Sequence, residues 1–457
     1  MRRAQSIVAT LLLVGVLAAA AYADRELEPR TFEAGVDGAA VSGVWLCPHG
    51  GGPEGWEVWL QIANPGPDPA TVRVRGLGSG RPSEPQEIRV EPGSFVRVPA
   101  AADGRARSSM VEWFGQWVAV GWVSHAGGGE GGVAAEPCAP EAGDRWFLPD
   151  GTTEVEGNEE FVVVMNPFAR EAVFSLTLLS ERTEPVRQGE LTDVVVKPFH
   201  SAVFHLNEVI LGERTVSTLL EVSVGRVAAA TLGVSGTGGI RSALGYLGQP
   251  PPVLTFPGGA DAGRTDLVVM NGGSAEGTGR VELAGEILGT EGVQPFAGLA
   301  EASLPPGSAR TFPATTAEAS AVRISVTGED AAAVRRTYGV VSDQAAITGA
   351  EPAAAWLVLP AVAGLPATPG LVLSNPSNEP VVVALSYLEP GPAERIELTV
   401  PPGATIQAPK EFRLLAPEVA VLAEASAGTF VPAAASYSLG REGLAAFAAA
   451  MAIPLPT

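Results

Sequence analysis

Residues 159–168 read EEFVVVMNPF, an apolar run that ends at Asn166-Pro167. Val162 and Val164 fall on one face of this run, which is typical of a β-strand with one buried side. The same arrangement, with apolar residues two and four positions before an Asn, occurs four times. The four asparagines are Asn64, Asn166, Asn271 and Asn375, spaced by 102, 105 and 104 residues. A nearly constant period of this length indicates tandem copies of one module.

Three further markers keep the same order in every copy. An apolar segment ending in Pro precedes each Asn, as at Leu148-Pro149, and a turn between strands follows it, as at Pro92-Gly93. The last marker is a Gly inside a hydrophobic hairpin, where a positive φ suits a two-residue loop. These glycines are Gly115, Gly225, Gly328 and Gly428. Four markers in register predict a repeated β-rich module.

Short strands separated by turns about every 8–12 residues favour an immunoglobulin-like sandwich. In the first copy the pattern predicts strands at 44–47, 56–63, 70–77, 86–90, 94–99, 109–114 and 117–124, with a return segment near 131–138. We therefore expect an all-β protein of four tandem immunoglobulin-like β-sandwich modules. The modules are expected at 24–140 (with an N-terminal extension), 141–250, 251–350 and 351–457. Gly/Pro-rich linkers are expected to hold them close but not rigidly, at 126–144, 235–252 and 341–354.

Residues 1–23 have the features of a secretory signal peptide. A positive start at Arg2 and Arg3 precedes an apolar run, and Ala21-Tyr22-Ala23 fits the small-x-small cleavage pattern. Cleavage after Ala23 predicts a secreted or cell-envelope-associated protein. The run is shorter than the roughly 20 apolar residues that a membrane span needs, so we expect no stable span in the mature chain.

The charge of the chain restricts its partners. The formal net charge is −21, and removal of Arg2 and Arg3 with the signal peptide makes it −23. Nucleic acids and anionic lipids are bound through basic side chains. A nucleic-acid partner is therefore not expected, and the charge does not identify another partner.

The four-marker pattern resembles an uncharacterised family of secreted repeat proteins from high-GC Gram-positive bacteria, a domain of unknown function. In that family, segments like Trp146-Phe147-Leu148-Pro149-Asp150-Gly151 lead into strands closed by Asn-Pro. The resemblance covers most of the mature chain and is strongest in 145–235. The third module departs from it, because Asn271-Gly272 replaces Asn-Pro. The resemblance implies the compartment and the fold, and it brings no activity and no site residues.

Cys47 and Cys138 are the only cysteines, and an even count in an exported protein favours a disulfide. Two free thiols are the alternative, and a metal site with His49 and His125 would match no standard zinc spacing. The pair connects the first strand of module one with the end of the same module. Since terminal repeats need a cap, we expect the bond to limit fraying of this end module.

Six of the eight tryptophans lie in the first module. Strand parity predicts that Val58, Leu60 and Ile62 face inward and that Trp59 faces outward, between Glu57 and Gln61. An exposed Trp beside polar groups can stack on a sugar or contact a partner. Packing of Trp59 against a neighbouring loop or module is the alternative.

The acidic loop 150–160 is a weak candidate for a Ca²⁺ site, with oxygen ligands from Asp150, Glu154 and Glu156. Its spacing does not match an EF-hand, and a solvated loop is the alternative. No other metal and no cofactor are predicted.

The sequence contains no Gly-x-Ser-x-Gly elbow, phosphate-binding loop or His-Glu-x-x-His motif. We expect a non-enzymatic exported protein that acts as a cell-envelope or extracellular scaffold, with an unknown protein or polysaccharide of the cell surface as partner. The alternative is a carbohydrate-binding protein that uses the Trp-rich first module. An extracellular hydrolase has less support, although paired carboxylates that meet only in the fold would not be visible in the sequence.

Overall fold

The structure is a computed structural model. It describes residues 42–51, 55–100, 107–127, 131–154, 157–236, 238–258, 264–274, 279–314, 319–339, 344–361, 367–389, 395–409, 419–439 and 445–456. The predicted signal peptide, its cleavage site after Ala23 and the candidate ligand Glu156 lie outside these residues. Val41–Leu455 form one compact unit. All the strands belong to the Val41–Leu455 unit.

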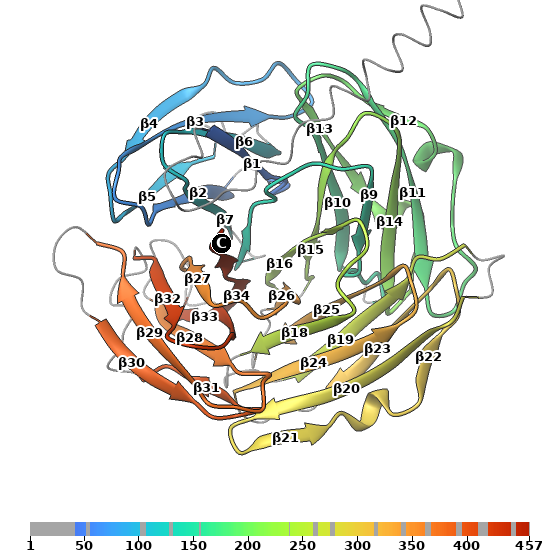
Figure 1. Cartoon of the computed structure of the whole chain (residues 1–457). Coiled ribbons are helices and arrows are strands. Elements are labelled where there is room, and N and C mark those ends of the chain that lie inside the picture. The colour runs from blue at the N-terminus through green and yellow to red at the C-terminus, as the bar shows by residue number, and fades with distance from the viewer. Residues whose placement is uncertain are drawn as a thin grey trace, which may run out of the picture. The chain divides into compact units, whose positions relative to one another are not determined.

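The strands fall into four consecutive groups, which we call strand sets (Figure 1). The first set comprises β1 (Ser42–Cys47), β2 (Glu57–Asn64), β3 (Ala70–Leu77), β4 (Gln86–Val90), β5 (Ser94–Pro99), β6 (Ser108–Phe114), β7 (Ala119–Ala126) and β8 (Gly132–Pro137). The second comprises β9 (Arg145–Leu148), β10 (Glu159–Asn166), β11 (Ala172–Ser180), β12 (Val194–Val196), β13 (His200–His205), β14 (Val216–Val224), β15 (Ala228–Val234), β16 (Ile240–Leu244) and β17 (Tyr246–Leu247). The third comprises β18 (Val253–Gly258), β19 (Arg264–Asn271), β20 (Val281–Gly289), β21 (Gly292–Pro295), β22 (Ala302–Leu304), β23 (Ser308–Ala314), β24 (Ser320–Thr327), β25 (Ala331–Tyr338) and β26 (Gln344–Thr348). The fourth comprises β27 (Ala355–Val358), β28 (Ala367–Ser374), β29 (Val381–Tyr387), β30 (Arg395–Val400), β31 (Thr405–Gln407), β32 (Val421–Ala425), β33 (Val431–Leu439), β34 (Ala445–Met451) and β35 (Ile453–Pro454).

Each set forms two antiparallel sheets with the same strand order. In the first set the first sheet has the order β1-β6-β3-β4 and the second has the order β5-β2-β7-β8. The later sets repeat both orders, with β17 and β35 added beside β9 and β27, and with β21 and β22 both paired to β20. The protein is therefore all-β, built from multiple antiparallel sheets with a recurring pairing order.

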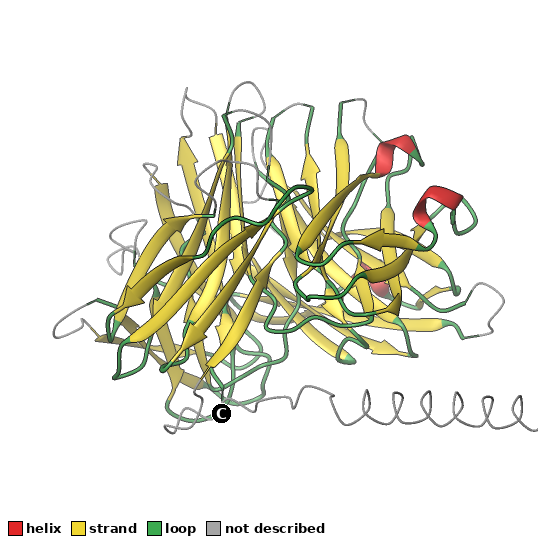
Figure 2. Cartoon of the chain, turned by 90° about the horizontal axis from the view of Figure 1, so that it is seen from above, coloured by secondary structure: helices red, strands yellow, loops and turns green. Residues whose placement is uncertain are grey.

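Helical structure is minor in the described residues, which contain no α-helix. The short 3-10 turns are η2 (Gly189–Leu191), η3 (Leu206–Glu208) and η4 (Ala297–Leu299), drawn in red in Figure 2. No helix among the described segments is long and apolar enough to cross a membrane. Strands and their connecting segments therefore position the polar side chains of the interior.

The two sheets of a set differ in burial. The outer strands β4 and β30 of the first sheets keep most of their side chains at least partly exposed. In the second sheets, every residue of β7 and of β15 is buried. Single hydrophobic cores also join residues of different sets, as Val123 with Leu371 and Ala243 with Val334 do. The inner strands of the second sheets are thus covered on both faces, by their own partner sheet and by neighbouring sets.

The last main strands of the four sets meet in a closed cycle. β8 contacts β16, β16 contacts β26, β26 contacts β34, and β34 contacts β8 again. Figure 1 shows β16, β26 and β34 in the middle of the view, surrounded by the other strands. Small residues favour this close approach, since the four sequences are GVAAEP, IRSAL, QAAIT and AAFAAAM. The first strand set therefore packs directly against the fourth.

This cycle changes two expectations from the sequence. The segments predicted as linkers contain strands, since β8 lies within 126–144, β16 and β17 within 235–252, and β26 within 341–354. Their Gly and Pro residues flank short strands instead of forming loose connections. The first set is also no open end, because β8 contacts β34. The expectation that the first set is an open end in need of a cap is therefore wrong.

The four repeated asparagines tie the two sheets of each set together. Each is fully buried at or just beyond the end of the second strand. Asn64 Nδ2 donates to the carbonyl oxygens of Asp68 (2.8 Å) and Val90 (3.1 Å), and its Oδ1 accepts from the Gly66 N–H (3.0 Å). Asn166, Asn271 and Asn375 repeat the three kinds of contact. The short side chain of Asn supplies both donors and the acceptor.

The four hairpin glycines also lie at matching places, between the sixth and seventh strands of the common order. Their φ values are 90°, 80°, 127° and 81° for Gly115, Gly225, Gly328 and Gly428. A side chain at a positive φ is strained, so Gly suits this turn.

Substitution of Asn375 by Ala is expected to lower the free energy of unfolding by about 2–3 kcal/mol, because buried carbonyl groups lose their donors. Asn378→Ala, three positions further on and exposed, is the matched control and should change it by less than about 0.5 kcal/mol. Urea unfolding of both variants measures the difference. Equal stability of the two variants would show that the Asn375 side chain does not help to hold the two sheets of its set together.

Candidate functional site

A cluster of buried charges lies where the second strand set meets the third. Asp150 follows β9, Arg241 lies on β16 and Arg336 lies on β25. Arg241 Nε donates to Asp150 Oδ2 at 2.7 Å, and Arg336 Nε donates to Asp150 Oδ1 at 2.8 Å. The side chains of all three are at most 1% exposed. Both carboxylate oxygens of Asp150 are thus occupied by cations from two different strand sets.

Two more side chains complete what we call the charge cluster. Glu160 of β10 accepts from Arg241 Nη2, and its Oε2 also accepts from the Thr152 N–H at 3.2 Å. Gln344 of β26 accepts from Arg241 Nη1 at 2.9 Å. The charge cluster (Asp150, Glu160, Arg241, Arg336 and Gln344) holds two acids and two bases, so its formal charges balance.

The electrostatics of the two acids differ. Burial opposes the ionisation of Asp150, but the attraction and hydrogen bonds of Arg241 and Arg336 outweigh it and hold the pKa of this carboxyl below its usual value. Burial raises the pKa of Glu160 to about 7; the attraction of Arg241 opposes this rise and repulsion from Asp150 adds to it. Asp150 is therefore the permanent anion of the cluster, and Glu160 titrates near neutrality.

A third acid, Glu136 of β8, extends the site toward the first strand set. It is 2% exposed, and neither carboxylate oxygen has a hydrogen-bond partner. Burial raises the pKa of Glu136 well above its usual value, the Leu244 N–H opposes this and Asp150 adds to it. Nearby, the Tyr246 hydroxyl donates to the Ala333 carbonyl oxygen (2.8 Å) and accepts from the Gly349 N–H (2.6 Å). Burial, with Glu136 adding to it, also raises the pKa of Tyr246.

The arrangement is suited to joining strand sets. Further polar contacts cross the same junction: Arg145 Nη1 donates to Asp330 Oδ1 at 2.5 Å, and the hydroxyls of Thr215 and Thr311 are 2.7 Å apart. A buried ion pair resists separation because each partner would be left as an uncompensated charge. The second and third sets are therefore held by polar ties as well as by apolar packing.

The predicted Ca²⁺ site does not form around Asp150. Its carboxylate is buried and bound to two guanidinium groups, whereas Glu154 is exposed and Glu156 lies outside the described residues. The acidic sequence suggested oxygen ligands, but Arg241 and Arg336 come from strands 91 and 186 residues away. Across the described stretches, no group of three or more His, Cys, Asp or Glu side chains could hold a metal ion.

The predicted surface around Trp59 is also changed. Trp59 is half-buried; its Nε1 donates to Glu57 Oε2 at 3.4 Å, and the Arg97 guanidinium lies 5.2 Å from the centre of its ring. Gln61 is only 1% exposed, so it is not part of an accessible surface. Leu60 and Ile62 are buried as predicted. The alternation of the strand predicted an exposed Gln61. Gln61 is buried instead, because this part of the second sheet is covered on both faces.

The other tryptophans of the first set pack within the structure. Trp45, Trp113 and Trp122 are buried, and Trp56 and Trp117 are half-buried. Trp45 Nε1 donates to the Val118 carbonyl oxygen at 2.7 Å, and its ring meets that of Trp117 edge to face. The Trp-rich composition is thus largely explained by packing.

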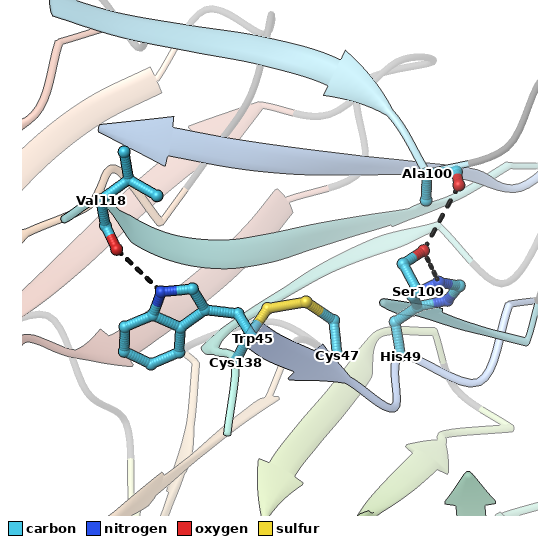
Figure 3. The surroundings of a disulfide bond; sticks show 7 residues. All are labelled: Trp45, Cys47, His49, Ala100, Ser109, Val118 and Cys138. Atoms are coloured by element: carbon cyan, nitrogen blue, oxygen red, sulfur yellow. Dashed lines mark hydrogen bonds between the residues drawn. A yellow bond between two sulfur atoms is a disulfide. The ribbon is translucent and has the colours of Figure 1, made fainter. Parts of the chain in front are cut away.

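Cys47 and Cys138 form a disulfide, as predicted, with Cα atoms 4.6 Å apart (Figure 3). The bond joins the end of β1 to the segment after β8. Beside it, the His49 ring nitrogen Nε2 lies 3.0 Å from Ser109 Oγ (Figure 3). Burial, with Arg107 adding to it, lowers the pKa of His49 to about 3, so this ring is neutral. A disulfide is compatible with an extracellular protein.

The sequence reasoning missed the charge cluster and Glu136. One signal was present, because Arg335 and Arg336 interrupt the apolar run that begins at Ala331. A charged residue inside a fully buried strand requires a partner. The sequence does not say which acid supplies it.

The chain shows limited similarity to curated proteins and to solved structures. Among curated proteins, none matches the chain. Among solved structures, "Thermotoga maritima 1070" is 23% identical, with 23% of this chain and 96% of that chain covered and a TM-score of 0.21. A "tetra-tandem repeat in extending region of large adhesion protein" is 10% identical, with 86% and 92% covered and a TM-score of 0.09.

These structural scores are too low to support a conclusion about fold or function. The family comparison is more informative. Residues 100–360, more than half of the chain, match a family of unknown function, DUF5719. This range includes the charge cluster, Glu136 and Cys138. The chain therefore belongs to the family of unknown function DUF5719.

Proposed function

We propose that this chain is a non-enzymatic exported protein whose four immunoglobulin-like modules act as a scaffold or interaction protein of the cell envelope or extracellular space. The predicted signal peptide and the disulfide support export. The recurring order of the strand sets supports the four modules. The origin of the family in high-GC Gram-positive bacteria and its repeat character belong to the same proposal.

The observation that carries the proposal is the closed cycle of contacts between the strand sets. Four independent modules on linkers would move relative to one another. Here the inner strands of the second sheets, such as β7 and β15, are buried, and the ionic groups Asp150 and Arg336 join one set to the next. The first sheets keep exposed outer strands, such as β4 and β30. A rigid body with repeated outer faces is suited to holding partners at fixed positions.

The carbohydrate-binding alternative has weaker support. A sugar stacks on the open face of an aromatic ring. Arg97 lies over the ring of Trp59, and Trp59 is half-buried. We therefore propose the scaffold and use Trp59 to separate the two functions.

Export and envelope binding test the proposal in the native host. The protein is expected outside the cytoplasm with Asp24 as its N-terminal residue, and the purified mature chain is expected to sediment with isolated cell envelopes. Mass spectrometry of the N-terminus and a sedimentation assay measure the two. Recovery of intact Met1 protein in the cytosol, or no binding to envelopes, would contradict the proposal.

Trp59→Ala and Trp117→Ala, two half-buried positions of the same set, provide the discriminating control. On the scaffold proposal both variants bind envelopes like the wild type. Loss of binding in Trp59→Ala alone would favour the carbohydrate-binding function.

A further inference from the structure

Glu136 occupies an unusual position at the junction of the first two strand sets. It lies on β8, the strand of the first set that contacts both β16 and β34. Its carboxyl group is buried and has no hydrogen-bond partner. An ionised carboxylate in such a place is costly, because burial removes its hydration and only the Leu244 N–H favours the charged form. The neutral acid is therefore the form that fits this junction.

The groups around Glu136 come from several elements. On β7, Trp122 lies directly opposite, and its Nε1 also has no partner. β16 brings the Leu244 N–H and Arg241, β17 brings Tyr246, and the segment after β9 brings Asp150. β34 carries no titratable side chain, and His125 of β7 points to the opposite face of its sheet.

The guanidinium groups of Arg241 and Arg336 already have hydrogen-bond acceptors. Arg241 donates through Nε, Nη1 and Nη2 to Asp150, Gln344 and Glu160. Arg336 donates through its three nitrogens to Asp150, to the Tyr338 hydroxyl and to the Gly151 carbonyl oxygen. Every guanidinium nitrogen of the cluster thus has an acceptor. Ionised Glu136 would gain no counter-ion from it and would be repelled by Asp150.

We propose that Glu136 is a pH-sensitive lock between the first and second strand sets: its neutral form holds β8 against β16, and its ionisation weakens this contact. Such a lock goes beyond the proposed scaffold function, because the closed cycle of strand sets would open when Glu136 ionises. An exported protein meets changes of external pH directly, so such a lock would be set by the surroundings of the cell.

The sign of the effect follows from the direction of the shift. The pKa of Glu136 is higher in the folded chain than in the unfolded chain, so the folded state binds the extra proton. The stabilisation is fully present below the unfolded pKa and is lost as pH rises through the folded one. Glu160, whose pKa is raised to about 7, likewise contributes stability that is lost as pH rises. Asp150, with a lowered pKa, stabilises the fold above its unfolded pKa and loses that effect only in acid.

The test compares the thermal unfolding of the full mature chain with that of Glu136→Gln between pH 5 and pH 9. Gln keeps the size of the neutral acid and does not titrate. We expect the midpoint of the wild type to fall steadily with rising pH, and that of Glu136→Gln to fall by at most half as much. The variant is then the more stable of the two at pH 9. Glu159→Gln, at an exposed position of β10, is the matched control and should follow the wild type.

A local measurement accompanies the midpoints. Amide hydrogen exchange of β8 and β16 in the wild type, corrected for the intrinsic pH dependence of exchange, should accelerate at pH 9 relative to β4. The acceleration should be smaller in Glu136→Gln, in which only the contribution of Glu160 remains. If the Gln variant does not fold, Glu136→Leu replaces it and should show the same flattened pH profile. Parallel pH profiles for wild type and variant, or exchange that accelerates equally in both, would overturn the proposal.

Discussion

Asp150→Asn is expected to lower the free energy of unfolding by about 3–5 kcal/mol, the cost of breaking a buried ion pair and leaving its partners uncompensated. The effect should be large because one carboxylate serves both Arg241 and Arg336, and all three side chains are buried. Denaturant unfolding near pH 7 measures it. Asp144→Asn, the same change at an exposed position, is the control and should stay within about 0.5 kcal/mol of the wild type.

A double variant makes this test specific. If Asp150 and Arg336 act as a pair, Asp150→Asn combined with Arg336→Gln should cost less than the sum of the two single changes. Strictly additive costs, or a cost for Asp150→Asn no larger than that of the control, would show that the cluster does not join the second and third strand sets.

Removal of the disulfide, by Cys47→Ala together with Cys138→Ala, should cost about 4.6 kcal/mol in the chain-entropy model, because the bond closes a separation of 91 residues. The first set packs against both the second and the fourth. The loss should therefore lower the unfolding midpoint of the whole Val41–Leu455 unit. Denaturant unfolding of the oxidised wild type and the double variant measures it.

Reductant provides the control for this prediction. It should bring the wild type to the stability of the double variant and leave the double variant unchanged. A double variant as stable as the oxidised wild type would contradict the proposed contribution of the bond. Loss of structure confined to β1–β8 would restore the idea of a local cap.

Much of the strand pattern was accessible from local sequence. The predicted strands 70–77, 86–90 and 94–99 coincide with β3, β4 and β5. Apolar and polar residues alternate along these strands, or the strands end at Pro and Gly turns. A few neighbouring residues are therefore enough to predict their positions. The disulfide could be predicted for a similar reason, because only two cysteines exist.

The contacts between strand sets were not accessible in this way. Gln61 alternates with Leu60 and Ile62 as a surface residue would, and its burial comes from neighbouring sets that lie far away in the sequence. Asp150 looked like part of an acidic loop because its partner Arg336 is 186 residues away. Periodicity describes one face of one strand, whereas these sites depend on what covers the other face.

Calorimetric unfolding of the mature chain tests the closed cycle most directly. If the strand sets are held together through β8, β16, β26 and β34, they should unfold in one cooperative transition, with equal calorimetric and van't Hoff enthalpies. Several separate transitions, each with the enthalpy of a single strand set, would contradict the cycle and show that the four sets are independent.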